Sequence, residues 1–210
     1  MPTSRAVLIW AGLAIAIAVP SILAALSPLL AWRDPVYIVA GFAGLAAMVL
    51  VLVQPLLAGG LLPGLPPRIG RRVHRFVGIA LVLMVVIHVA GLWKTSAPDV
   101  IDALLFESPT AFSPWGVVAM WAVFAAALLA ALRGPLRINP LVWRIGHSLL
   151  AVVIAVGTVV HAVLIEGPME PVSKALFGAL VLIVTAKVLL DLRAWALLAR
   201  RKAASRPSSG

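Results

Sequence analysis

The sequence predicts an all-α integral membrane protein, built as a bundle of six transmembrane helices. Of its 210 residues, 63% are hydrophobic and only 11% are charged. The mean hydropathy is +1.12, and six long apolar runs follow one another along the chain. A soluble domain is roughly half apolar and about a quarter charged. This chain therefore lacks the polar residues needed to cover a surface in water.

The six runs cover residues 6–30, 36–57, 76–93, 114–132, 141–165 and 171–192. Each comes close to the roughly 20 apolar residues that a helix needs to cross a bilayer. None alternates with a period of two, as a strand would. The first run is longer than the apolar core of a signal peptide, about 7–15 residues, so we expect a retained span. We expect one transmembrane domain over residues 1–199 and a disordered basic cytoplasmic tail over residues 200–210.

The formal net charge of +10 is explained by membrane topology and does not require nucleic acid. If the N-terminus is cytoplasmic, all of the 17 Lys and Arg residues lie inside except Arg33, Lys94 and Lys174. All seven acidic residues except Asp191 then lie outside. This distribution follows the positive-inside rule. It predicts a multi-pass membrane protein with both termini in the cytoplasm, surrounded by lipids and without a nucleic-acid partner.

The four histidines occupy only two segments, associated with the third and fifth spans. Fourteen residues separate His74 from His88, and the same number separates His147 from His161. Four helical turns take about 14.4 residues, so each pair lies on one face, about 21 Å apart along the helix axis. Both spans run from inside to outside. We therefore expect His74 to face His147 near the cytoplasm and His88 to face His161 near the outer surface.

Two facing imidazoles at each of two levels indicate two b-type haems between the third and fifth spans. A haem iron takes axial ligands on opposite faces of the macrocycle, so His74, His147, His88 and His161 are the expected iron ligands. Zinc needs about four ligands, and no carboxylate accompanies the histidines as in a di-iron site. Chemistry that depends on a cysteine is excluded, because the chain has none.

Other residues near the histidines allow two interpretations each. Arg75 and Arg144 flank the inner pair and could bind haem propionates through their guanidinium groups, or could serve only as positive-inside anchors. The glycines of the two spans would allow a macrocycle to approach the backbone, or would only pack helices together. The segment over residues 100–106 is either a short interfacial helix above the outer haem or a plain connector.

Histidines within a membrane also occur without haem. They form hydrogen bonds between helices and can line proton paths. A non-redox transporter or channel with a His-lined proton or ion path is therefore the main alternative. Such a path usually needs further polar groups, and Ser148 and Thr158 are the nearest. A structural or assembly subunit without activity is a third alternative.

The two histidine segments, "RRVHRFVGIALVLMVVIHVAGL" and "WRIGHSLLAVVIAVGTVVHAVL", resemble the ferric reductase-like transmembrane domain family. This family includes ferric reductases, NADPH oxidases and the haem subunit of a periplasmic methionine sulfoxide reductase system. The resemblance covers essentially the whole chain and the order of its spans. The cytochrome b of quinol oxidases spaces its histidines similarly, but there the ligands lie on the second and fourth helices.

The resemblance implies that the protein carries electrons across the membrane, either as an oxidoreductase or as an electron-transfer subunit of one. It implies a cytoplasmic flavoprotein reductase or a quinol as donor. The implied acceptor on the outer side is ferric iron, oxygen or a periplasmic oxidoreductase. Many members carry a flavin and nucleotide domain after the sixth span. This chain has no G-x-G-x-x-G fingerprint, so we expect no FAD or NAD(P) site and a stand-alone bacterial type.

Overall fold

The described part of the chain, in a computed structural model, is all-helical and covers residues 3–204, with side chains described through Leu192. Six of its helices are long and apolar enough to cross a membrane, which confirms the expected six-span architecture. The elements are α1 (Ser4–Ala25), a short 3-10 turn (Pro28–Leu30), α2 (Pro35–Ala58), α3 (Pro67–Thr95), α4 (Ala97–Leu104), α5 (Ser113–Leu132), α6 (Pro140–Leu164) and α7 (Pro171–Ala204).

Three boundaries differ from the expected ones. The first helix ends at Ala25, before the 3-10 turn that completes the apolar run. The third helix begins at Pro67, well before the expected residue 76. Its first turns are rich in arginine, so a search for apolar residues misses them. Proline, in contrast, favours the start of a helix. The last helix runs through Ala204 and so includes residues 200–204 of the expected tail; residues 205–210 lie outside the described part.

Polar residues immediately before several helices fix where those helices begin. The Asp34 carboxylate accepts a hydrogen bond from the backbone nitrogen of Val36 at 2.7 Å. The Asn139 side chain accepts one from Leu141 at 2.8 Å. A side-chain cap satisfies an amide that the first turn of a helix leaves unpaired. These two caps set the starts of α2 and α6, the helices on which Gln54 and two of the histidines lie.

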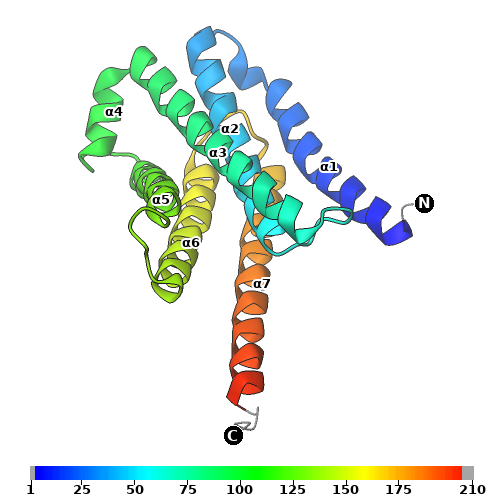
Figure 1. Ribbon diagram of the computed structural model, residues 1–210. Helices are drawn as coiled ribbons and strands as arrows, with labels where there is room; N and C mark the ends of the chain where they lie inside the picture. The colour runs from blue at the N-terminus through cyan, green and yellow to red at the C-terminus, as the bar shows by residue number, and fades with distance from the viewer. Residues whose placement is uncertain (1–2, 205–210) are drawn as a thin grey trace, which may run out of the picture.

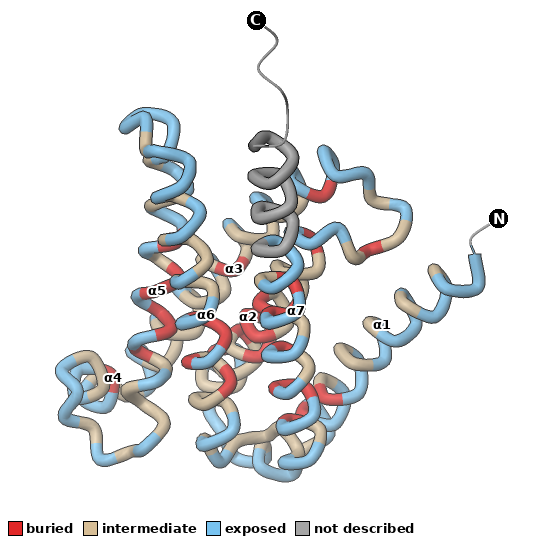
Figure 2. Tube along the Cα trace, turned by 90° about the horizontal axis from the view of Figure 1, so that it is seen from below, coloured by how far each residue is buried: buried red, intermediate tan, exposed pale blue. Residues whose placement is uncertain are grey.

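Two helix hairpins, α2–α3 and α5–α6, form the body of the protein, and α7 packs against both (Figure 1). α3 and α6 run in the same direction, as the alternation of spans requires (Figure 1). The closest helix contacts lie within the two hairpins, and Leu52 of α2 and Val181 of α7 are completely buried. Figure 2 shows buried residues on α2, α5, α6 and α7, whereas most of α1 leans away from these helices.

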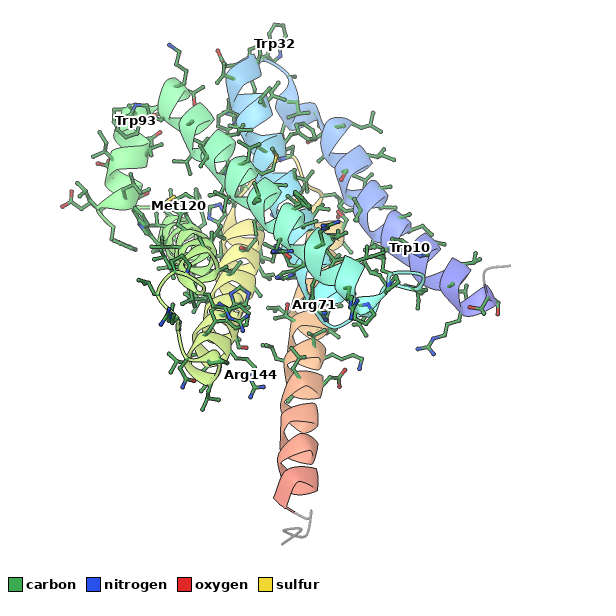
Figure 3. All side chains as sticks on the ribbon, viewed as in Figure 1. Trp10, Trp32, Arg71, Trp93, Met120 and Arg144 are labelled. Carbon is green, nitrogen blue, oxygen red and sulfur yellow. The ribbon has the colours of Figure 1, made fainter. Side chains whose placement is uncertain are left out.

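The outer surface of the bundle is apolar, as a lipid-facing surface must be. Exposed side chains include Ile79 and Leu83 on α3 and Leu149 on α6. Trp32 and Trp93 lie at one end of the bundle, and Arg71, Arg144 and Trp10 lie toward the other (Figure 3). Tryptophan and arginine are typical of the boundary between lipid and water.

Candidate functional site

The structure brings the four histidines together in the expected pairs. The ring centroids of His74 and His147 lie 6.2 Å apart, with an angle of 70° between the ring planes. Those of His88 and His161 lie 6.4 Å apart, with an angle of 83°. Both pairs connect α3 to α6. The histidines thus form an inner pair, at the end that carries Arg71 and Arg144, and an outer pair at the opposite end.

Between the two levels, Leu81 of α3 and Ile154 of α6 are buried in one apolar cluster that also includes residues of α2, α5 and α7. Each of the two helices packs closely against its own hairpin partner, α3 on α2 and α6 on α5, while few backbone contacts join α3 to α6 directly. Within the described residues, no third His, Asp or Glu joins either pair to form a metal-binding group of three. The geometry therefore offers two imidazole ligands at each level.

The outer pair is held by backbone carbonyl groups from the neighbouring helix of each hairpin. His88 Nδ1 donates to the oxygen of Ala40 at 2.7 Å, and His161 Nδ1 donates to the oxygen of Phe112 at 3.0 Å. A carbonyl can only accept, so the ring proton lies on Nδ1 and the lone pair on Nε2. A metal-bound histidine usually has this arrangement, because a hydrogen bond at one nitrogen fixes which nitrogen binds the metal.

A glycine behind each outer histidine makes room for its ring. A Cβ at Gly44 would lie 2.9 Å from Nδ1 of His88, and a Cβ at Gly116 would lie 2.6 Å from Nδ1 of His161. In both hairpins the glycine follows the accepting carbonyl residue, Ala40 or Phe112, by four positions. The two hairpins thus build the outer pair in the same way. The sequence has no obvious internal repeat that would have revealed this similarity.

The inner pair is not built symmetrically. His74 Nδ1 lies 3.2 Å from the backbone oxygen of Gln54 on α2, and the side-chain amide of Gln54 also reaches this ring nitrogen. Gln54 follows Ala40 by the same 14 residues that separate His74 from His88. Sequence analysis missed Gln54, although a lone glutamine in an apolar span was an available signal, since polar side chains in membranes usually have a role.

His147 has aromatic rather than polar support. Its ring stacks on Trp143, with centroids 5.1 Å apart and planes 10° apart. The guanidinium of Arg133 lies over the ring of Trp143, 4.2 Å from its centroid, as a cation–π contact. Nδ1 of His147 and Nε1 of Trp143 are buried without a hydrogen-bond partner in the described structure. In α5 the position 14 residues after Phe112 is Ala126, which cannot provide the amide that Gln54 provides on α2.

The predicted propionate ligands, Arg75 and Arg144, are both exposed, on α3 and α6 respectively. Within the described part, neither forms an ion pair or a side-chain hydrogen bond, so each has a guanidinium available to an anion. Their role stays a prediction. Arg133, which sequence analysis did not single out for this site, contacts the aromatic support of the inner pair.

The glycines of α3 and α6 pack their helices within each hairpin. A Cβ at Gly91 would lie 2.7 Å from that of Ala40, and a Cβ at Gly157 would lie 3.0 Å from that of Ala119. Their nearest neighbours therefore belong to α2 and α5 and not to the opposite histidine helix. Of the two interpretations from sequence, helix packing accounts for these glycines.

Three features organise the outer end. The segment before α5 contains a cluster of hydroxyl groups, in which Ser108 bonds to Thr110 at 3.0 Å and to Ser113 at 3.2 Å, next to the carbonyl of Phe112. Of the two alternatives for residues 100–106, the structure has a short helix: α4 covers Ala97–Leu104 and packs on α3 and α5. Lys174 on α7 is only 6% exposed and donates from Nζ to the oxygen of Ile165 at 2.7 Å. It ties α7 to the end of α6 just beyond His161.

Comparisons of the chain with protein-family models, with curated proteins and with solved structures found no significant match. The interpretation of the site therefore rests on its own geometry.

Proposed function

We propose that the protein carries single electrons across the membrane through two b-type haems, one held by His74 and His147 and the other by His88 and His161. The observation that supports this proposal is the distance between the paired rings. A metal–nitrogen bond of about 2 Å, together with roughly 1 Å from that nitrogen to the ring centre, places two imidazole centroids about 6 Å apart across one ion. The measured centroid distances are 6.2 Å and 6.4 Å.

The surroundings of the rings support ligation as well. Haem iron, when bound, supplies the one-electron chemistry, and the residues of this chain hold and orient the ligands. The carbonyls of Ala40 and Phe112 orient His88 and His161 with the Nε2 lone pair available. Trp143 supports the ring of His147. The apolar helices around the pairs exclude water from the path between the two levels.

The direction of transfer in this proposal follows from the distribution of charge. The inner pair lies at the arginine-rich end, which the positive-inside rule assigns to the cytoplasm. Both termini would then be cytoplasmic, in the inner membrane of a bacterium. Electrons would enter at the inner pair from a flavoprotein reductase or a quinol, because this chain has no nucleotide-binding fingerprint. They would leave from the outer pair to ferric iron, oxygen or a periplasmic redox partner.

Haem content measured on purified protein and on four single variants tests the proposal. We expect two haems per chain in the wild type, with a Soret band and a reduced-minus-oxidised spectrum of b type. His74→Ala and His147→Ala should abolish the inner haem, and His88→Ala and His161→Ala the outer one. Thr158→Ala is a matched control on α6, because it removes a polar group of the alternative ion path and should leave both haems bound. Folded wild-type protein without bound haem would refute the proposal.

A further inference from the structure

The Gln54 side chain meets His74 in a way that has no counterpart at the outer pair. One terminal atom of its amide lies 2.6 Å from Nδ1 and 3.1 Å from the backbone oxygen of His74. The other terminal atom lies 3.0 Å from the backbone nitrogen of Gly78. Nδ1 also lies 3.2 Å from the backbone oxygen of Gln54. This ring nitrogen therefore faces one group that only accepts and one amide that can either donate or accept.

The orientation of the amide and the position of the ring proton are coupled. With its nitrogen toward His74, the amide donates to Nδ1 and to the backbone oxygen of His74, and its oxygen accepts from Gly78. These three contacts are then satisfied and the ring proton must lie on Nε2, so Nδ1 no longer donates to the backbone oxygen of Gln54. With its oxygen toward His74, the amide accepts from Nδ1–H and Nε2 carries the lone pair. The amide oxygen then faces the backbone oxygen of His74, and the amide nitrogen faces the backbone nitrogen of Gly78. Neither contact can be a hydrogen bond.

We infer that Gln54 is a positioning residue of the inner site and that its amide turns over when a metal takes Nε2 of His74. This inference rests on the proposed haem function. Without metal, the orientation with three satisfied hydrogen bonds holds the ring proton on Nε2, the nitrogen that must bind iron. The outer pair has no such conflict, because the carbonyls of Ala40 and Phe112 already place the proton on Nδ1.

The inference has a measurable consequence for haem affinity. Turning the amide over loses about one net hydrogen bond, which corresponds to about a tenfold weaker binding of haem at the inner site. Gln54→Met preserves the length of the side chain but removes the amide. The backbone oxygen of residue 54 remains and can still accept from Nδ1. The variant should therefore bind haem about tenfold more tightly at the inner site.

The first experiment needs no haem. Protein from haem-deficient cells is labelled with 15N histidine, and the His74 signal is assigned from the His74→Ala variant. We expect the ring proton on Nε2 in His74 but on Nδ1 in His88 and His161. In Gln54→Met, the proton of His74 should move to Nδ1. A proton on Nδ1 of His74 in the wild type, or no change in the variant, would overturn the inference.

The second experiment measures haem binding on a His161→Ala background, in which only the inner pair remains. Gln54→Met should tighten binding there, whereas Leu56→Met, which introduces the same side chain elsewhere on α2, should leave it unchanged. Circular dichroism confirms that each variant is folded. Unchanged or weaker binding in Gln54→Met would overturn the inference. If no protein binds haem, the proposed function fails, and the position of the ring proton still decides the coupling between Gln54 and His74.

Discussion

The ring of His161 has so little space behind it that a single methyl group should expel the outer haem. In Gly116→Ala the new Cβ would lie 2.6 Å from Nδ1 and 2.8 Å from Cε1 of this ring, whereas ordinary contact begins at 3.4 Å. The ring must therefore retreat by about 0.8 Å. Metal–ligand distances tolerate changes of only about 0.2 Å. The bond from Nδ1 to Phe112, 3.0 Å in the structure, must stretch or break as the ring moves.

We expect Gly116→Ala to keep the inner haem and to lose most of the outer one, because the ring is displaced by more than a metal–ligand distance tolerates. Total haem should therefore fall by about half. Gly44→Ala should have a smaller effect, because its Cβ would lie 2.9 Å from His88. Gly41→Ala is the matched control on the same helix, since nothing lies within 4 Å of a Cβ there. Haem quantitation and optical redox titration measure the series. Two haems with unchanged potentials in Gly116→Ala would refute the steric argument.

Three further predictions concern the frame around the site. Lys174→Met should destabilise the folded protein by about 1–3 kcal/mol in detergent unfolding, because the backbone oxygen of Ile165 loses its charged donor. An unchanged midpoint would contradict this. Backbone N–H groups of the first turn of α7 donate to the Glu170 carboxylate and hold its pKa below its ordinary value. The carboxylate therefore stabilises the first turn of α7 at neutral pH, and this stabilisation is lost as the pH falls through the lowered pKa. Hydrogen exchange of the backbone amides at the start of α7 should accelerate in acid. Glu170→Gln should remove this pH dependence. In a chain without cysteine, an impermeant maleimide applied to intact cells should label Glu107→Cys but not Gly134→Cys; the reverse pattern would invert the topology.

The six spans and the pairing of the histidines could be predicted because each depends on a simple period. Apolar length identifies a span, and a separation of 14 residues places His74 and His88 on one helical face. The start of α3 could not be placed correctly in the same way. Its first two turns carry arginines that lower the hydropathy, although Pro67 is a good first residue for a helix.

The supports of the histidines were much harder to predict. Ala40 and Phe112 act through backbone oxygens, which every residue has, so their side chains give no indication of this role. Gly44 and Gly116 are two of 16 glycines, and only the fold shows which of them lie behind an imidazole. Gln54 is the exception, because a glutamine in an apolar span is costly unless its amide finds a partner.

Few direct contacts join α3 to α6, so binding of the proposed haems would strengthen the association of the two hairpins. Each histidine helix packs mainly on its own hairpin partner, and α7 joins the two hairpins. A haem bound as proposed would add a direct link between α3 and α6. A ligand that binds only the native state raises the free energy of unfolding in proportion to the logarithm of its concentration. In cells short of iron, the protein would accordingly be less stable and would be cleaved more readily by proteases where the two hairpins meet.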